Sequence, residues 1–181
     1  MMTSPARHAA LRIASRLWAL ALLTSAVLNA SPQTPGSAAA TDSTLAISGD
    51  VTHPLTLTPA ELKAMPRTTV TIVDQGRDVK YTGVLVGEVL ARAGAPLGRE
   101  LSGAAVTTYV LASAKDGYQA VFSLAELDPA FTPNDIIIAD TVDGQPLFDY
   151  QGPFRIVAPH DKRGARSVRM LQRLEVVRLK K

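Results

Sequence analysis

The feature that most constrains the fold of this chain is a succession of short apolar or alternating segments separated by turn residues. Alternation of apolar and polar side chains is typical of strands that bury one face. Asp116-Gly117 and Asp143-Gly144 are pairs that favour tight connections between neighbouring strands. Strands are therefore predicted over residues 44–49, 54–58, 68–74, 79–83, 105–114, 118–122, 135–140, 154–159 and 167–179.

Helices are predicted only as short pieces between these strands. Thr58 and Glu61 have the spacing of a capping box, with Pro59 at the first helical position. Gly94 follows a segment with apolar residues at helical spacing, and Ser123 precedes a third helical segment. We expect helices over residues 59–65, 85–93 and 123–128. Strands that dominate over a few short helices indicate an α+β domain with a mixed β-sheet.

The N-terminal section has the pattern of a secretory signal peptide. Arg7, Arg12 and Arg16 precede the apolar run 17–28, and no acidic residue occurs before Asp42. This run is far shorter than the roughly 20 residues that a membrane-spanning helix needs. We expect cleavage after Ala30 or, preferably, within the small residues 37–40. The prediction is a signal peptide and flexible leader over residues 1–40, one folded domain over residues 41–181, and a periplasmic location.

Removal of the leader changes the charge of the protein. The whole chain carries 19 basic and 16 acidic residues, and the three arginines of the leader account for the difference. The mature part is therefore neutral overall, which argues against a nucleic-acid-binding protein. The section 155–181 nevertheless holds nine basic residues against Asp161 and Glu175. This section either binds an anion or forms a solvated basic face.

Several classes of chemistry are excluded by composition and spacing. The chain has no cysteine, so it has no disulfides, no thiol catalysis and no thiolate-bound metal. Its three histidines are scattered and show no metal-ligand spacing such as HExxH. Glycine-rich phosphate loops of the GxxxxGK type and nucleophile elbows are also missing from the sequence. No local motif decides the function by itself.

Five separated segments, taken in order, resemble a known family. They are residues 49–62, 81–94, 114–127, 135–147 and 152–176. Together they are similar to the oxidoreductase molybdopterin-binding domain of the sulfite oxidase type. The resemblance covers nearly all of the mature chain. It implies an α+β fold, built on a mixed sheet, that presents a pterin cofactor and its molybdenum to small substrates.

The last of these segments carries the residues that the resemblance assigns to the cofactor. Arg155 lies in the matching strand, and Arg166, Ser167 and Arg169 lie in a loop of the form GARSV. The resemblance implies that these side chains meet the pterin or its phosphate. Arginine supplies several fixed donors for phosphate, and a glycine-containing loop lets backbone N–H groups approach an anion. The alternative for Arg169 is an outward position on a strand.

The segment that would hold the metal departs from the family pattern. Metal-bearing members have a cysteine ligand after the strand that matches 68–74, and here Asp74 stands nearest to that position. A carboxylate is a harder and weaker ligand than a thiolate. Asp74 is either a molybdenum ligand or a turn residue whose side chain bonds nearby backbone N–H groups. Molybdopterin is thus a candidate cofactor, whereas the missing thiolate argues against bound molybdenum.

Three functions remain open from the sequence. The first is a degenerate binding module for a pterin-like or small anionic ligand, or for a partner protein in an envelope redox or signalling system. The second is a molybdopterin-dependent oxidoreductase with Asp74 or a non-protein oxygen as the metal ligand. The third is an interaction domain whose basic C-terminal section meets an acidic partner or a membrane surface.

Overall fold

The computed structural model describes residues 43–133, 135–148 and 150–180 of the 181-residue chain. The signal peptide and leader predicted over residues 1–40 lie outside the described residues, and so do both candidate cleavage sites. Across the described ranges, no helix is long and apolar enough to cross a membrane.

Ten strands form two sheets in the described part of the chain, here named sheet A and sheet B. The order in sheet A is β2 (Leu55–Leu57), β1 (Leu45–Gly49), β10 (Leu171–Arg178), β5 (Thr108–Ala114) and β6 (Gln119–Ser123). The order in sheet B is β3 (Thr68–Asp74), β4 (Arg77–Leu85), β7 (Ile137–Val142) and β8 (Gln145–Pro146), and β9 (Arg155–Val157) also pairs with β7. Strand β1 runs parallel to β10, and the other pairings described are antiparallel, so sheet A is mixed.

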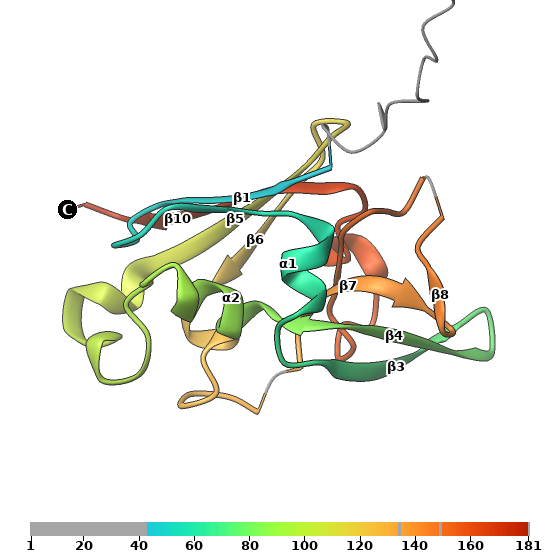
Figure 1. Ribbon diagram of the computed structural model, residues 1–181. Helices are drawn as coiled ribbons and strands as arrows, with labels where there is room; N and C mark the ends of the chain where they lie inside the picture. Colours follow the sequence, from blue (N-terminus) through green and yellow to red (C-terminus); the bar gives the residue numbers. More distant parts are fainter. Residues whose placement is uncertain (1–42, 134, 149, 181) are drawn as a thin grey trace, which may run out of the picture. The chain divides into compact units, whose positions relative to one another are not determined.

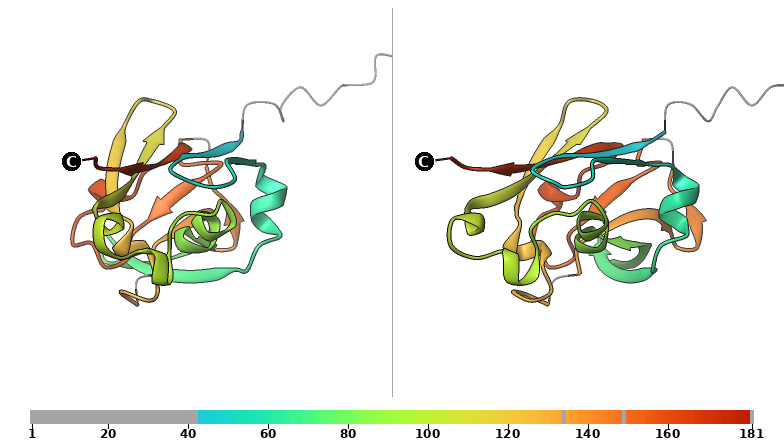
Figure 2. Two further views of the ribbon diagram at one scale, coloured as in Figure 1. Left: turned by 90° about the vertical axis from the view of Figure 1, so that its left-hand side faces the viewer. Right: turned by 60° about the vertical axis from the view of Figure 1, so that its left-hand side comes forward.

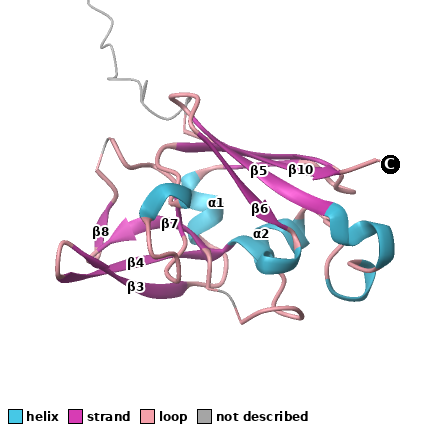
Figure 3. Ribbon diagram, turned by 180° about the vertical axis from the view of Figure 1, so that it is seen from behind, coloured by secondary structure: helices cyan, strands magenta, loops and turns pink. Residues whose placement is uncertain are grey.

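The helices are few and short, as Figure 3 shows in cyan against the magenta strands. The two α-helices are α1 (Pro59–Lys63) and α2 (Val86–Arg92). Single turns of 3-10 helix are η1 (Gly98–Glu100), η2 (Gly103–Thr107), η3 (Ala125–Leu127) and η4 (Gly164–Arg166). The capping box of α1 is present as predicted, with Thr58 and Glu61 bonding each other's backbone N–H. The predicted α+β class is confirmed.

The main core lies between the sheets. Figure 1 shows β1, β5 and β10 above α1 and α2, with β3 and β4 below the two helices and β7 beside them, and the views of Figure 2 agree. The main hydrophobic cluster takes buried residues from both sheets and both helices, including Ile47, Leu62, Leu90 and Ile138. A smaller cluster around Val70, Tyr81 and Val157 lies on sheet B.

Two hairpins of sheet B close through two-residue turns. Gln75 and Gly76 join β3 to β4, and Asp143 and Gly144 join β7 to β8, all with positive φ angles between 47° and 79°. Turns with two residues of positive φ match the twist of antiparallel strands. The Asp143-Gly144 turn is confirmed, and the first turn is shorter than the predicted QGRD segment. Asp74 is consequently the last residue of β3, paired with Arg77.

The predicted bounds of two strands and one helix differ clearly from the structure. The strand predicted over 167–179 begins only at Leu171, because Met170 has a φ of 48° and breaks the extended backbone. Residues 103–107 form η2 instead of the start of the strand predicted over 105–114. The helix predicted over 123–128 is the single turn η3. In each case a local turn replaces the first or last part of a regular pattern.

Candidate functional site

A cavity of about 600 Å³ lies where three connections of the fold meet. The end of β3, the turn between β5 and β6, and the loop between β9 and β10 all line it. We name residues 158–170 of the last connection the β9–β10 loop. The lining residues are Ile72, Val73, Asp74, Asp116, Tyr118, Arg155, Ala158, Pro159, Asp161, Lys162, Gly164, Ala165, Ser167 and Arg169.

Arg155 supplies a buried cation to this cavity. It begins β9, its residue is 7% exposed, and its NH1 group donates to Tyr81 Oη and Gln151 Oε1, each at 2.7 Å. Its guanidinium carbon lies 4.8 Å from the centroid of the Tyr81 ring. Its Nε is buried with no hydrogen-bond partner, and among the described residues it forms no ion pair. A buried arginine in this state retains donor capacity and a charge without an ion-pair partner among the described residues.

Burial and neighbouring charges also act on the pKa of Arg155. Burial lowers the pKa of Arg155 most, Tyr81 and Asp74 oppose this effect, and the neighbouring charge of Arg169 lowers it further. Arginine stays protonated in proteins despite such shifts. Two guanidinium groups that repel each other beside a cavity are stabilised by an anion placed between them.

Arg169 and Ser167 lie in the same cavity, in the β9–β10 loop. Arg169 is exposed, its guanidinium carbon lies 5.8 Å from the Tyr150 ring centroid, and it forms no ion pair with the described residues. Ser167 Oγ accepts a long 3.5 Å hydrogen bond from the backbone N–H of Ala158. The Ser167 hydroxyl thereby keeps its own proton for donation. Lys162 adds an exposed ammonium group to the same lining.

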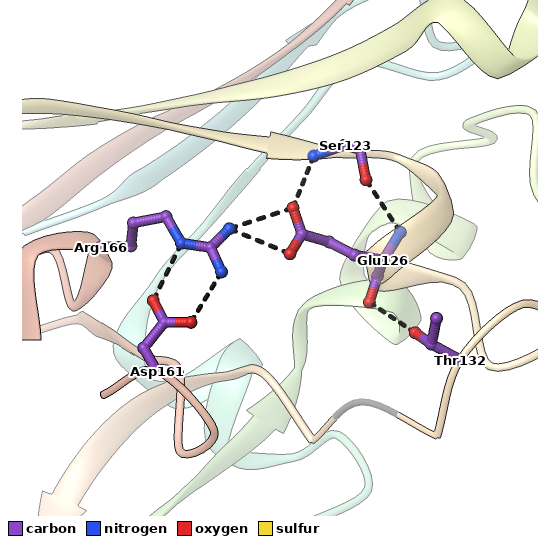
Figure 4. Close-up of polar contacts among 5 residues, drawn as sticks. All are labelled: Ser123, Glu126, Thr132, Asp161 and Arg166. Carbon is purple, nitrogen blue, oxygen red and sulfur yellow. Dashed lines mark hydrogen bonds and ion pairs between the residues drawn. The ribbon is translucent and has the colours of Figure 1, made fainter. Parts of the chain in front are cut away.

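Arg166 lies in the same loop but is not part of the cavity lining. Its Nε and NH2 groups donate to the two oxygens of Asp161 at 2.9 and 2.7 Å, and its NH1 group donates to both oxygens of Glu126. Figure 4 shows the guanidinium between these two carboxylates. The structure therefore brings together Arg155, Ser167 and Arg169 of the predicted cofactor residues and places Arg166 apart from them.

Asp74, the predicted metal residue, also lines the cavity, at the exposed end of β3. The described residues contain no group of three or more His, Cys, Asp or Glu side chains that could hold a metal ion. Asp74 thus lies in the cavity lining as a single carboxylate and is not part of a cluster of potential metal ligands among the described residues.

The cavity lining carries charges of both signs, and Asp74 lies near enough to Arg155 to act on its pKa. Arg155, Lys162 and Arg169 are cationic, whereas Asp74, Asp116 and Asp161 are anionic. Asp161 already accepts hydrogen bonds from Arg166, and Asp116 accepts one from the backbone N–H of Tyr118 at 2.9 Å. Carboxylates already bound to the protein compete less for the free guanidinium groups. An anion is consequently favoured at the side of the cavity that Arg155 and Arg169 form.

Some residues of the site carry no recognisable signal in the sequence. Tyr81 and Arg155 are 74 positions apart along the chain. They meet because β4 and β9 both pair with β7. Gln151 precedes β9 and accepts from Arg155. Tyr118, which follows the Asp116-Gly117 turn, is 48% exposed, lines the cavity and donates to Ala165 O at 2.6 Å. The DGY turn was the only local signal for it.

Comparisons with known proteins agree with this architecture. Residues 73–181 match the family model described as the oxidoreductase molybdopterin binding domain. Among solved structures, a chain of the sulfane dehydrogenase SoxCD from Paracoccus pantotrophus is similar, with a TM-score of 0.59 and 22% sequence identity. The match covers 75% of the present chain and 38% of the SoxCD chain, so the present chain spans well under half of that protein chain. No curated protein matches.

Proposed function

The chain belongs to the oxidoreductase molybdopterin binding domain family, and from this premise we propose that it is a non-redox binding module for a pterin-like or other small anionic ligand. The observation that carries the proposal is Arg155, a buried cation beside the cavity whose Nε has no partner. Burying an uncompensated charge costs stability, and this cost is offset when an anionic ligand binds.

Molybdopterin is the cofactor that family membership implies, and the residues fit only part of it. The guanidinium groups of Arg155 and Arg169 and the hydroxyl of Ser167 suit the phosphate or another anionic group of a pterin compound. The metal part does not fit, because the chain has no cysteine to supply the thiolate ligand of metal-bearing members. We therefore derive no redox step at this site.

In the proposed complex, each cavity residue has a separate task. Arg155 supplies a fixed positive charge from a buried position, held by Tyr81 and Gln151. Arg169 supplies a more mobile guanidinium from the exposed loop, and Ser167 donates its hydroxyl proton. Arginine forks suit an oxyanion with two or three oxygens better than a halide. Asp74 and Asp116 face the ligand as acceptors, which suits the amino and amide N–H groups of a pterin ring.

The test uses pterin-6-carboxylate, a fluorescent anionic pterin, titrated with the mature protein. We expect saturable quenching that inorganic phosphate at high concentration reverses by competition. Arg169→Met should weaken binding by about tenfold or more, since a charge-assisted hydrogen bond contributes about 1.5–3 kcal/mol. Arg163→Met is the matched control, because Arg163 is an exposed arginine of the same loop outside the cavity lining. Equal binding by the wild type and Arg169→Met would disprove the proposal.

The rival function is a molybdenum oxidoreductase in which Asp74 holds the metal, and the position of Asp74 in the cavity lining favours it. Elemental analysis of protein purified from a molybdenum-replete host separates the two. The binding module predicts much less than one molybdenum per chain, unchanged by Asp74→Asn. Stoichiometric molybdenum that Asp74→Asn removes would establish the rival.

We also propose that the protein works outside the cytoplasm, with an envelope redox or signalling protein as its partner. The basic and apolar pattern of residues 7–28 supports export. Fractionation of cells that express the full chain tests the location, and N-terminal sequencing of the secreted form identifies the cleavage site. Crosslinking in the same cells tests the partner, which we expect to contact the mature domain in the periplasmic fraction.

A further inference from the structure

Arg166 lies at the centre of an ion-pair network that joins three parts of the chain. Its guanidinium bonds Asp161 of its own loop and Glu126 of η3, and its central carbon lies 4.9 Å from the ring centroid of the buried Phe122 in β6. Glu126 is anchored in turn, since its Oε1 accepts from the backbone N–H of Ser123 at 2.7 Å and its backbone C=O accepts from Thr132 Oγ1. Figure 4 shows the polar contacts of this network, among Arg166, Asp161, Glu126, Ser123 and Thr132.

The same geometry separates Arg166 from any ligand in the cavity. Each of its three nitrogens donates to a carboxylate, with distances from 2.7 to 3.1 Å. Phe122 covers one face of the guanidinium. Arg166 is absent from the cavity lining, whereas its neighbours Ala165 and Ser167 are part of it.

We propose that Arg166 is a positioning residue: it binds the β9–β10 loop to η3 through Glu126 and so places Ser167 and Arg169 at the cavity. This inference rests on the proposed function, because it concerns the same binding site. Glu126 lies outside the cavity lining, so the inference predicts that Glu126 affects ligand affinity only through Arg166.

The loop needs such a support, because it contains little regular structure. Its internal backbone bonds are those of single turns, from the N–H of Asp161 to Ala158, of Ser167 to Gly164 and of Val168 to Arg166. Single hydrogen bonds also join Ala165, Val168 and Met170 to neighbouring segments. A loop held by turns and single bonds places its side chains less accurately than a strand does. The hydrogen bonds to Asp161 come first among the causes that raise the pKa of Arg166, and those to Glu126 contribute too. Both pairs thus favour the charged arginine that holds the loop.

Glu126→Gln distinguishes positioning from direct contact, with pterin-6-carboxylate fluorescence as the measurement. If Arg166 touched the ligand, weakening its bond to Glu126 would free it and tighten binding. Positioning predicts the opposite: Glu126→Gln and Arg166→Met each weaken binding by about three- to tenfold. The double variant should bind no more weakly than Arg166→Met alone, because both changes break one connection. Arg166→Lys, which keeps the charge, should restore part of the affinity.

Two matched controls accompany these variants. Ser123→Ala removes the hydroxyl that accepts the backbone N–H of Glu126 without touching the Arg166 ion pairs, and Arg163→Met removes a neighbouring arginine. Both should bind within about twofold of the wild type. Tighter or unchanged binding in Glu126→Gln would overturn the inference, while the proposed function would stand if Arg169→Met still lost affinity.

Failure of the wild type to bind the probe would refute the proposed function. Amide hydrogen exchange would still test the role of Arg166 in that case. Positioning predicts faster exchange of the Ser167 and Val168 amides in Glu126→Gln and Arg166→Met than in the wild type and both controls. Unchanged exchange of these amides would overturn the role of Arg166. Circular dichroism confirms that each variant is folded before these measurements.

Discussion

Arg155 is the residue on which the proposed binding depends. The fold buries its guanidinium against Tyr81, gives it two neutral acceptors, and leaves Nε without a partner. Neutral acceptors compensate a buried charge less than a carboxylate does. We therefore expect Arg155 to lower the stability of the ligand-free protein, and the proposed ligand to supply the missing compensation.

Arg155→Met should separate binding from stability. Methionine fills a similar volume without a charge, so we expect the melting temperature to stay the same or rise, as when buried charges are replaced by apolar side chains. Pterin-6-carboxylate binding should fall by about tenfold or more. Thermal unfolding followed by circular dichroism, together with the fluorescence titration, measures both effects. The exposed Arg173 of β10 provides the control variant Arg173→Met. A large loss of stability in Arg155→Met would show that Arg155 supports the fold rather than a ligand.

At the scale of the elements, strand pairing brings the two halves of the site together. Strand β7 pairs with β4 on one side and with β9 on the other, which places Tyr81 near Arg155. At Gly83 of β4 the two strands approach closely, because a Cβ there would meet the carbonyl oxygen of Ile138. The sheet thus holds the buried end of the site rigidly, while the β9–β10 loop supplies the exposed end.

Gly83→Ala should loosen the pairing of β4 with β7. The added methyl group collides with backbone atoms that cannot rotate away, so we expect a loss of about 1–3 kcal/mol in the free energy of unfolding. Urea denaturation measures this loss. Gly164→Ala is the matched control, because a Cβ at Gly164 meets nothing within 4 Å. Similar stability of the two variants would contradict the close approach of β4 and β7.

The capping box of α1 gives a prediction for acid pH. The backbone N–H and then the hydroxyl of Thr58 lower the pKa of Glu61 by bonding its carboxylate. A carboxylate with a lowered pKa in the folded state stabilises the fold above its ordinary pKa, and this contribution is lost as the pH falls through the folded-state pKa. Glu61→Gln should therefore be less stable than the wild type at neutral pH, with the difference shrinking in acid. Melting temperatures at pH 7 and pH 3 measure it, and a constant difference would argue against the capping bond.

For the whole molecule, the first and last strands lie side by side at the centre of sheet A. Strand β10 pairs in parallel with β1 and antiparallel with β5, and it buries Leu171, Leu174 and Val176. A sheet that needs a strand from the end of the sequence forms its core only from contacts of long sequence separation. We expect slow folding compared with helical proteins of this size.

Removal of residues 171–181 should abolish cooperative unfolding, because sheet A would lose its middle strand and leave unpaired edges on β1 and β5. Removal of residues 179–181 should leave the melting temperature within a few degrees of that of the full mature chain, since Leu179 is exposed and lies beyond β10. Differential scanning calorimetry of the two truncated proteins tests this contrast. A cooperative transition in the longer truncation would show that β10 is dispensable.

Local patterns were sufficient for most elements of this fold. Alternation located β1, β3 and β6, and the Thr58 to Glu61 spacing identified α1, because short-range side-chain chemistry determines them. The order of the strands within two sheets was not predictable, since alternation marks a buried face but does not identify the partner strand. The late start of β10 was not predictable for a similar reason, since the positive φ of Met170 depends on a turn that tertiary contacts fix.

The sequence by itself determined the absence of a thiolate ligand and the basic character of the last segment, because composition and residue order need no folding to be known. Only the tertiary structure decided which arginines face the cavity. Arg166 and Arg169 lie three positions apart in one loop, yet Glu126, 40 residues before Arg166, holds the first one away while the second lines the cavity. A guanidinium binds whichever carboxylate lies nearest, and folding alone determines which residues those are.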